Sequence, residues 1–177
     1  MTTGWQGILN DGEEILWQGR PDTAPVLTPS AFGKLIFGLF FSGFAVFWMI
    51  GAASTGGIFW MFGLIHFFAG VGVMGSGVFW PGIKARYTWY SLSNQRAFIA
   101  TDFPWATRRL KSFPITAGTS LSLEEGKLDT VLFASEDYRV KGRTRTHRIG
   151  FQRIRDGRAV YNMMRDIQRA DQQESHA

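Results

Sequence analysis

No Asp, Glu, Lys or Arg occurs between Lys34 and Lys84, a stretch of 49 residues. One membrane-spanning helix needs about 20 apolar residues, so this stretch has room for two helices and a turn. The apolar runs are residues 35–53 and 58–80, and the turn-forming residues 54–57 separate them. Helices over these runs would be roughly 28 and 34 Å long, close to the ~30 Å hydrocarbon core of a bilayer. We therefore predict a transmembrane helical hairpin rather than two buried helices of a soluble protein.

The flanks of the apolar stretch predict where the helices begin and how they are oriented. Thr28 is a favourable N-cap and Pro29 suits the first helical position, whereas Pro81 is expected to end the second helix. Lys84 and Arg86 follow the second run, and positively charged flanks stay in the cytoplasm. Both termini are therefore predicted to be cytoplasmic, with only the short turn on the far side.

Small residues recur at helical spacing in both apolar runs. Gly63, Gly70 and Gly77 are seven residues apart, and Gly38 and Ser42 are four apart. Small residues allow membrane helices to approach each other closely. We predict that these faces form either the contact between the two helices or a seam between copies of the chain.

His66 is an ionisable residue within the predicted membrane spans. Such residues are candidates for function by default. The simpler interpretation is a neutral imidazole bound to Ser42 or to a backbone carbonyl, because no carboxylate lies in the spans to complete a proton relay.

Residues 84–177 carry 17 Lys and Arg against 10 Asp and Glu, so positive charge concentrates next to the apolar stretch. Turn residues there separate short segments that predict about seven antiparallel strands, at residues 87–92, 96–101, 108–113, 120–123, 128–134, 137–141 and 144–151. Apolar residues then recur at helical spacing from Asp156, a favourable N-cap, to about Ala170. The predicted class is α+β, with a C-terminal amphipathic helix.

Seven short strands followed by one helix is the order of a pleckstrin-homology (PH) domain. Three segments strengthen this interpretation, namely Glu13–Pro21, Tyr90–Arg96 and Phe151–Asp156. With them, nearly the whole chain resembles the bacterial PH-like membrane proteins. The resemblance implies a split β-barrel behind a two-span hairpin in the bacterial inner membrane, and it carries no catalytic residue. Trp17 is accordingly expected to pack against the barrel or at the membrane interface.

The predicted organisation has four parts. A cytoplasmic leader covers residues 1–34, the transmembrane hairpin covers 35–83, the PH-like domain covers 84–170, and a disordered tail covers 171–177.

Basic residues cluster near the last predicted strands, at Arg139, Lys141, Arg143, Arg145 and Arg148. The four at odd positions would share one face of an extended chain, unless the turn at Gly142 breaks the alignment. Each basic residue near an anionic leaflet contributes about 1 kcal/mol to membrane attraction. A second candidate patch comprises Arg108, Arg109 and Lys111. The alternative is that these charges only set the topology.

The predicted function is a non-enzymatic, membrane-anchored binding or scaffold module that contacts anionic lipid, a protein partner by strand addition, or both. One alternative is an oligomeric structural subunit assembled through the glycine-rich helices. Another is an enzyme or transport component that depends on His66. No cofactor or metal is expected, because the chain has no Cys and its three His are scattered. Nucleic acid is not expected, because the basic segment lacks interleaved aromatic residues.

Overall fold

The computed structural model describes residues 5–25, 28–140 and 142–174, with only the backbone of Arg143. The chain divides into two compact units. One unit comprises residues 23–85, and the other combines residues 1–22 with residues 86–177. The second unit is therefore assembled from both sides of the apolar stretch.

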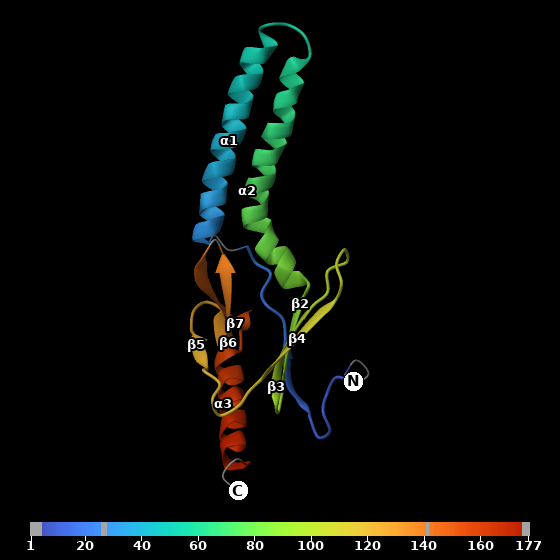
Figure 1. Cartoon of the computed structure of the whole chain (residues 1–177), viewed down its shortest axis with the longest axis vertical. Helices are drawn as coiled ribbons and strands as arrows, with labels where there is room; N and C mark the ends of the chain where they lie inside the picture. The colour runs from blue at the N-terminus through green and yellow to red at the C-terminus, as the bar shows by residue number, and fades with distance from the viewer. Residues whose placement is uncertain (1–4, 26–27, 141, 175–177) are drawn as a thin grey trace. The chain divides into compact units, whose positions relative to one another are not determined.

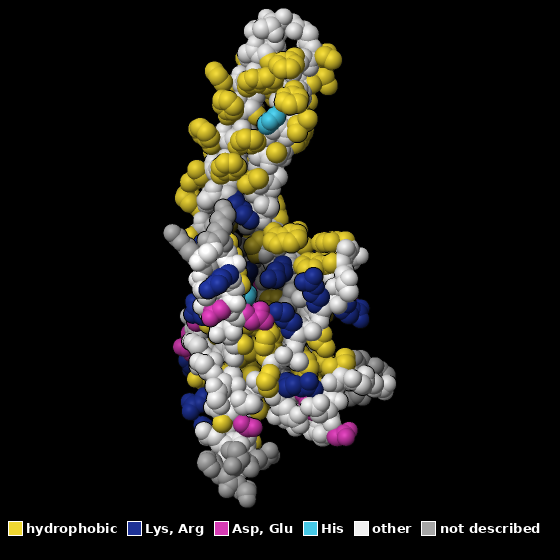
Figure 2. All heavy atoms as spheres, viewed as in Figure 1, with side chains coloured by type: hydrophobic (Ala, Val, Ile, Leu, Met, Phe, Trp, Pro, Cys, Tyr) yellow, Lys and Arg dark blue, Asp and Glu magenta, His cyan; other side chains and the backbone are white. Residues whose placement is uncertain are grey.

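The apolar unit is a helical hairpin (Figure 1). It contains α1 (Pro29–Ala53), the short 3-10 helix η1 (Phe59–Met61) and α2 (Phe62–Arg86). The predicted start of α1 is confirmed, because the Thr28 hydroxyl accepts a hydrogen bond from the Ala31 N–H at 3.1 Å. Both helices are long and apolar enough to cross a membrane. Large apolar side chains cover their outer surfaces (Figure 2), and Phe40 and Phe47 are 77% and 75% exposed.

The predicted end of the second helix at Pro81 is wrong, because α2 continues through Pro81 to Arg86. Proline removes one backbone donor and strains the preceding turn, but its fixed φ is compatible with a helix. Continuing the helix keeps the backbone groups on both sides of Pro81 paired, which favours extension over an early end.

The other unit contains two antiparallel sheets and a helix. The first sheet has the order β1-β2-β3-β4, with β1 at Ile15–Gly19, β2 at Thr88–Ser93, β3 at Arg96–Thr101 and β4 at Arg109–Pro114. The second sheet has the order β5-β6-β7, with β5 at Ser122–Glu124, β6 at Asp129–Val140 and β7 at Arg143–Ile154. The C-terminal helix, α3, covers Gly157–Glu174.

The α+β class is confirmed, with two apolar helices, seven antiparallel strands and a C-terminal helix. Three details differ from the prediction. β1 precedes the helices and pairs with β2, so six of the seven strands in the described part of the chain follow the hairpin. The strands predicted at 128–134 and 137–141 form one strand, β6, up to Val140, and residue 141 lies outside the described residues. The helix α3 continues to Glu174, into the predicted tail.

The core lies where the two sheets and α3 face one another. Alternation along β2 turns Tyr90 and Leu92 inward. Phe151 of β7 and Met164 of α3 meet them, and Leu92, Phe151 and Met164 are fully buried. Trp89, Ser91 and Ser93 lie on the opposite face of β2. That face carries the polar and aromatic groups of the candidate site.

Candidate functional site

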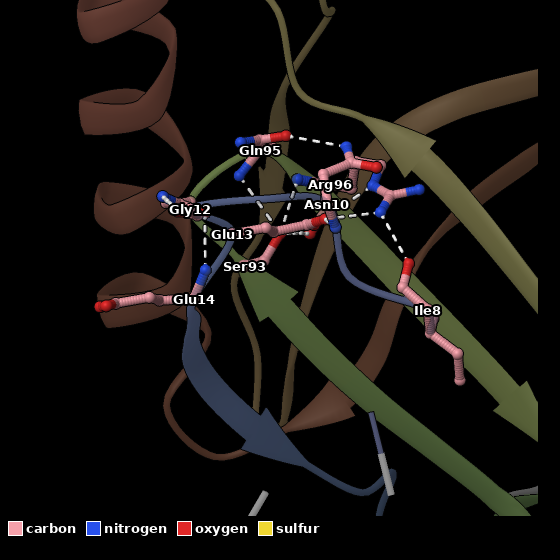
Figure 3. A network of polar contacts seen from close by, with 9 residues as sticks. Ile8, Asn10, Gly12, Glu13, Glu14, Ser93, Gln95 and Arg96 are labelled. Carbon is pink, nitrogen blue, oxygen red and sulfur yellow. Dashed lines mark hydrogen bonds and ion pairs between the residues drawn. The ribbon is translucent and has the colours of Figure 1, made fainter. Parts of the chain in front are cut away.

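The buried carboxylate of Glu13 links the segment before β1 to the β2–β3 turn (Figure 3). Its oxygens accept hydrogen bonds from the Asn10 N–H at 2.8 Å and the Ser93 hydroxyl at 2.5 Å. The Arg96 guanidinium donates two more, at 3.2 and 2.5 Å. The Glu13 side chain is 0% exposed, so every bond replaces water that the carboxylate has lost.

The environment of Glu13 favours its ionised form. Burial by itself raises the pKa of Glu13, but hydrogen bonds from Arg96, Asn10 and Ser93 outweigh burial and lower the pKa to about 2. Arg96 also donates to the Ile8 carbonyl at 3.1 Å and lies over the Phe98 ring. The network therefore holds the N-terminal segment against β3 as a structural clamp.

The three segments that carry the family resemblance contact one another. Glu13 of the first binds Ser93 and Arg96 of the second. Trp17 of the first donates its indole N–H to the Asp156 carboxylate of the third, and its ring lies 5.3 Å from that of Phe151. Trp17 thus packs against the core, as predicted. The contacts among these three segments account for their residue types by packing within the domain.

A pocket of about 500 Å³ lies on the outer face of the first sheet. Its lining includes Trp5, Gln18, Arg20, Trp89, Ser91 and Phe98. The volume falls in the range of small-molecule sites, about 300–1,000 Å³. The lining combines aromatic rings with amide, hydroxyl and guanidinium groups and contains no carboxylate, which suits an anionic ligand with an apolar part.

Arg20 is the charged group of this pocket. Its guanidinium lies over the Trp89 ring, 4.7 Å from the centroid, which restrains it by a cation–π contact. Among the residues that the structure describes, Arg20 has no acidic partner. On the same sheet, Gln18 reaches the Ser91 hydroxyl at 3.4 Å, and Trp5 packs on Phe98 with centroids 5.1 Å apart.

Sequence reasoning missed this pocket. Arg20 and Trp89 are far apart in the sequence, and they meet because β1 pairs with β2 across the helical hairpin. Trp89 and Ser91 alternate with the inward-facing residues of β2, but an isolated strand gives no indication of what its outer face adjoins. The one available sequence signal was that Arg20 directly follows the segment Ile15–Gly19, so it could have been expected at the end of a strand.

The basic hairpin formed by β6 and β7 does not present all its arginines on one face. Arg139 pairs with Thr144 and Ser135 pairs with Arg148, so Arg139 and Arg148 share one face of the ribbon. Arg145 pairs with Tyr138 and lies on the other face. The turn at Gly142 therefore breaks the alignment, because between Ser135 and Val140 the odd positions of β6 pair with even positions of β7.

The predicted basic candidates differ in their partners. Three form exposed ion pairs, Arg148–Glu124 at 2.8 Å, Lys111–Glu136 at 3.0 Å and Arg108–Asp102 at 2.7 Å. The exposed side chains of Arg109, Arg139 and Arg145 have no acidic partner within the described part of the chain. Lys141 and the side chain of Arg143 lie outside the described residues. The unpaired arginines are the ones most available to an anionic surface.

Within the hairpin, the small residues line the contact between α1 and α2. A Cβ at Gly70 would clash with the Ser42 hydroxyl, and one at Gly38 would lie 2.6 Å from the Gly70 carbonyl. Gly63 and Gly77 similarly face α1, next to Met49 and Ala31. The glycine face is therefore used inside one chain.

His66 lines a smaller pocket of about 250 Å³ between the helices. Its Nδ1 lies 3.3 Å from the Phe62 carbonyl, and its ring adjoins those of Phe41 and Phe62. Ser42 instead donates to the Phe67 carbonyl at 3.2 Å. Of the two partners expected for His66, the structure therefore shows a backbone carbonyl.

In the described residues, no three His, Asp or Glu side chains gather in a way that could hold a metal ion. In comparisons with protein-family models, curated proteins and solved structures, no match to this chain was found.

Proposed function

We propose that this chain is a non-enzymatic, membrane-anchored binding module that takes the anionic headgroup of a phospholipid in the Arg20–Trp89 pocket. The helical hairpin anchors it in a bacterial inner membrane with both termini in the cytoplasm. Its domain of two sheets and a helix serves as a PH-like recognition unit.

The observation that carries the proposal is the position of this pocket along the chain. Trp89 is three residues beyond Arg86, the last residue of α2. An extended chain covers at most about 3.6 Å per residue, so Trp89 lies within about 11 Å of the helix end. If α2 spans the membrane, the pocket is within reach of lipid headgroups.

The chemistry of the lining supports a phosphate-bearing headgroup. Arg20 offers several donors in a planar fork, which suits phosphate oxygens. Gln18 and Ser91 add neutral donors, and the Trp5 ring, which covers the buried Phe98, can pack against glycerol or the first acyl carbons. Arg109, Arg139 and Arg145 would add attraction to an anionic leaflet of about 1 kcal/mol each.

The test is a titration of the full chain, purified in neutral detergent, with dihexanoyl phosphatidylglycerol or dihexanoyl phosphatidylcholine. The chain contains seven Trp, of which Trp5 and Trp89 line the pocket, so occupancy is read as the fluorescence change that is lost in Trp89→Phe. We expect a saturable change with the anionic lipid only. Arg20→Ala should raise the half-saturation concentration about tenfold, the cost of a charge-assisted hydrogen bond.

The matched control is Arg165→Ala, which removes an exposed arginine of α3 that does not line the pocket. It should leave the titration unchanged. Equal responses to the two lipids, or unchanged binding in Arg20→Ala, would overturn the proposal and direct the search to a protein ligand.

The full chain is required because β1 belongs to the same sheet as β2. A fragment that starts after the spans would lack an edge strand and four pocket residues, Trp5, Gln18, Gly19 and Arg20. A negative result with such a fragment would therefore report misfolding rather than lipid preference.

The alternative of an oligomeric subunit assembled through the glycine face has less structural support. Gly63, Gly70 and Gly77 already contact α1 within one hairpin. Assembly through that face would require the two helices to separate and lose these close contacts.

A further inference from the structure

An aromatic cluster at the β3–β4 loop has no role in the proposed pocket. The rings of Phe103 and Trp105 stack with centroids 5.5 Å apart and an interplanar angle of 25°. The Tyr87 ring contacts both, at 5.6 and 5.9 Å. Trp105 is nevertheless 64% exposed, so the stacked cluster presents an apolar ring at the surface.

The loop is held in a defined shape. The Asp102 N–H donates to the Tyr87 carbonyl at 3.0 Å, and the Ala106 N–H donates to the Phe103 carbonyl at 3.2 Å. The Arg108 guanidinium closes the loop with two hydrogen bonds to one Asp102 oxygen, at 3.0 and 2.7 Å. The exposed ring of Trp105 is thus presented by an ordered turn.

The position of the cluster follows from chain connectivity. Tyr87 comes directly after Arg86, where α2 ends. Because both loop rings touch the Tyr87 ring, they lie close to the point where the chain leaves that helix. Tyr and Trp concentrate at membrane–water interfaces, where an apolar ring body and a polar edge are both accommodated.

The charges around the loop suit the same environment. Arg86 lies next to Tyr87, and the exposed Arg109 follows the loop without an acidic partner among the described residues. Arginines beside interfacial aromatic rings match the negative surface potential of a cytoplasmic leaflet. The apolar rings and the flanking positive charges thus favour a bilayer surface over a neutral protein groove.

We infer that residues 102–108 form an interfacial anchor, with the Trp105 ring inserted among lipid headgroups next to the end of α2. The inference rests on the proposed membrane location of the hairpin, but not on occupancy of the Arg20 pocket. With this anchor, the sheet β1-β2-β3-β4 is attached to the bilayer at the Trp105 loop as well as through α2. The second attachment limits rotation of the domain about the end of α2.

The experiment places a fluorophore in the loop of the full chain. The sequence contains no cysteine, so Ala106→Cys labelled with an NBD maleimide gives a single probe beside an intact Trp105. The protein is reconstituted in phosphatidylcholine–phosphatidylglycerol vesicles, with or without lipids that carry a nitroxide on the headgroup. We expect strong quenching of the loop probe, and loss of that quenching when Trp105→Ala is added.

Two further probes separate the possible failures. Phe47→Cys lies on the outer surface of α1 and should be quenched by nitroxides on the acyl chains, while Gln173→Cys on α3 should remain unquenched. If the probe at position 47 is quenched but the loop probe is quenched no more than the probe at position 173, the interfacial anchor alone is overturned. An unquenched probe at position 47 would overturn the membrane placement as well.

Discussion

Glu13 is a buried carboxylate whose partners come from two distant parts of the sequence. Asn10 lies on its own segment, while Ser93 and Arg96 lie on β2 and β3. Breaking a buried pair leaves the remaining charge without compensation, and this cost usually exceeds the net value of the intact pair. The clamp is therefore a site where a small chemical change has a large effect.

Glu13→Gln should lower the free energy of unfolding by about 2–3 kcal/mol, because the partly exposed Arg96 loses its carboxylate but can still reach water. Thermal unfolding of the full chain in detergent measures this loss. Glu14→Gln is the matched control, since the neighbouring carboxylate is exposed and should change stability little. Equal stability of the two variants would contradict the role of the clamp.

Stability should also depend on pH through Glu13. Its pKa is lowered from 4.5 to about 2 in the folded protein, so the unfolded chain binds the proton more readily. The stabilisation is complete above pH 4.5 and is lost as the pH falls toward 2. The midpoint of thermal unfolding should thus fall more steeply over this range in the native chain than in Glu13→Gln. Parallel curves would argue against a lowered pKa.

At the scale of elements, the small residues of the hairpin determine how closely its helices pack. Gly70 meets Ser42 and the Gly38 carbonyl, whereas a Cβ added at Gly72 would meet no neighbouring atom within 4 Å. The two glycines lie two residues apart on α2 and therefore provide a direct comparison.

Gly70→Leu should destabilise the hairpin by about 1–3 kcal/mol, because the added side chain forces α1 and α2 apart. Gly72→Leu should be tolerated, since it adds volume on the open side. Unfolding of both variants in mixed micelles measures the difference, and light scattering reports any change in the number of copies. A loss of assembly without loss of hairpin stability would favour the oligomer alternative.

Several element boundaries followed from local residue chemistry. The N-cap at Thr28 and the hairpin of β2 and β3 needed only nearby residues, and both are present. The predicted helix end at Pro81 is wrong because proline removes only one backbone donor, and the other backbone groups stay paired when the helix continues. The strand break predicted near residue 135 does not occur, because pairing with β7 keeps β6 extended.

At the scale of the whole molecule, the helical hairpin is an insertion between β1 and β2 of the other unit. The chain leaves the sheet after β1 and returns at β2, so both ends of the hairpin enter one domain. If the hairpin spans the membrane, the turn at residues 54–57 is on the opposite side from both termini.

A cysteine scan tests this topology in cells, because the native chain contains no cysteine. Thr55→Cys should react with a membrane-impermeant maleimide added outside the inner membrane. Gln173→Cys should react only after the membrane is permeabilised. The reverse pattern would contradict the orientation, and reaction of both sites in sealed cells would contradict a spanning hairpin.

The sequence by itself determined the apolar hairpin, the α+β class and the amphipathic C-terminal helix, because these depend on composition and periodicity within short windows. Only the tertiary structure decided that β1 joins β2, that Glu13 is clamped by Arg96, and that Arg20 meets Trp89 in a pocket. These contacts join residues on either side of the hairpin, and no local propensity records which distant strand will become a neighbour.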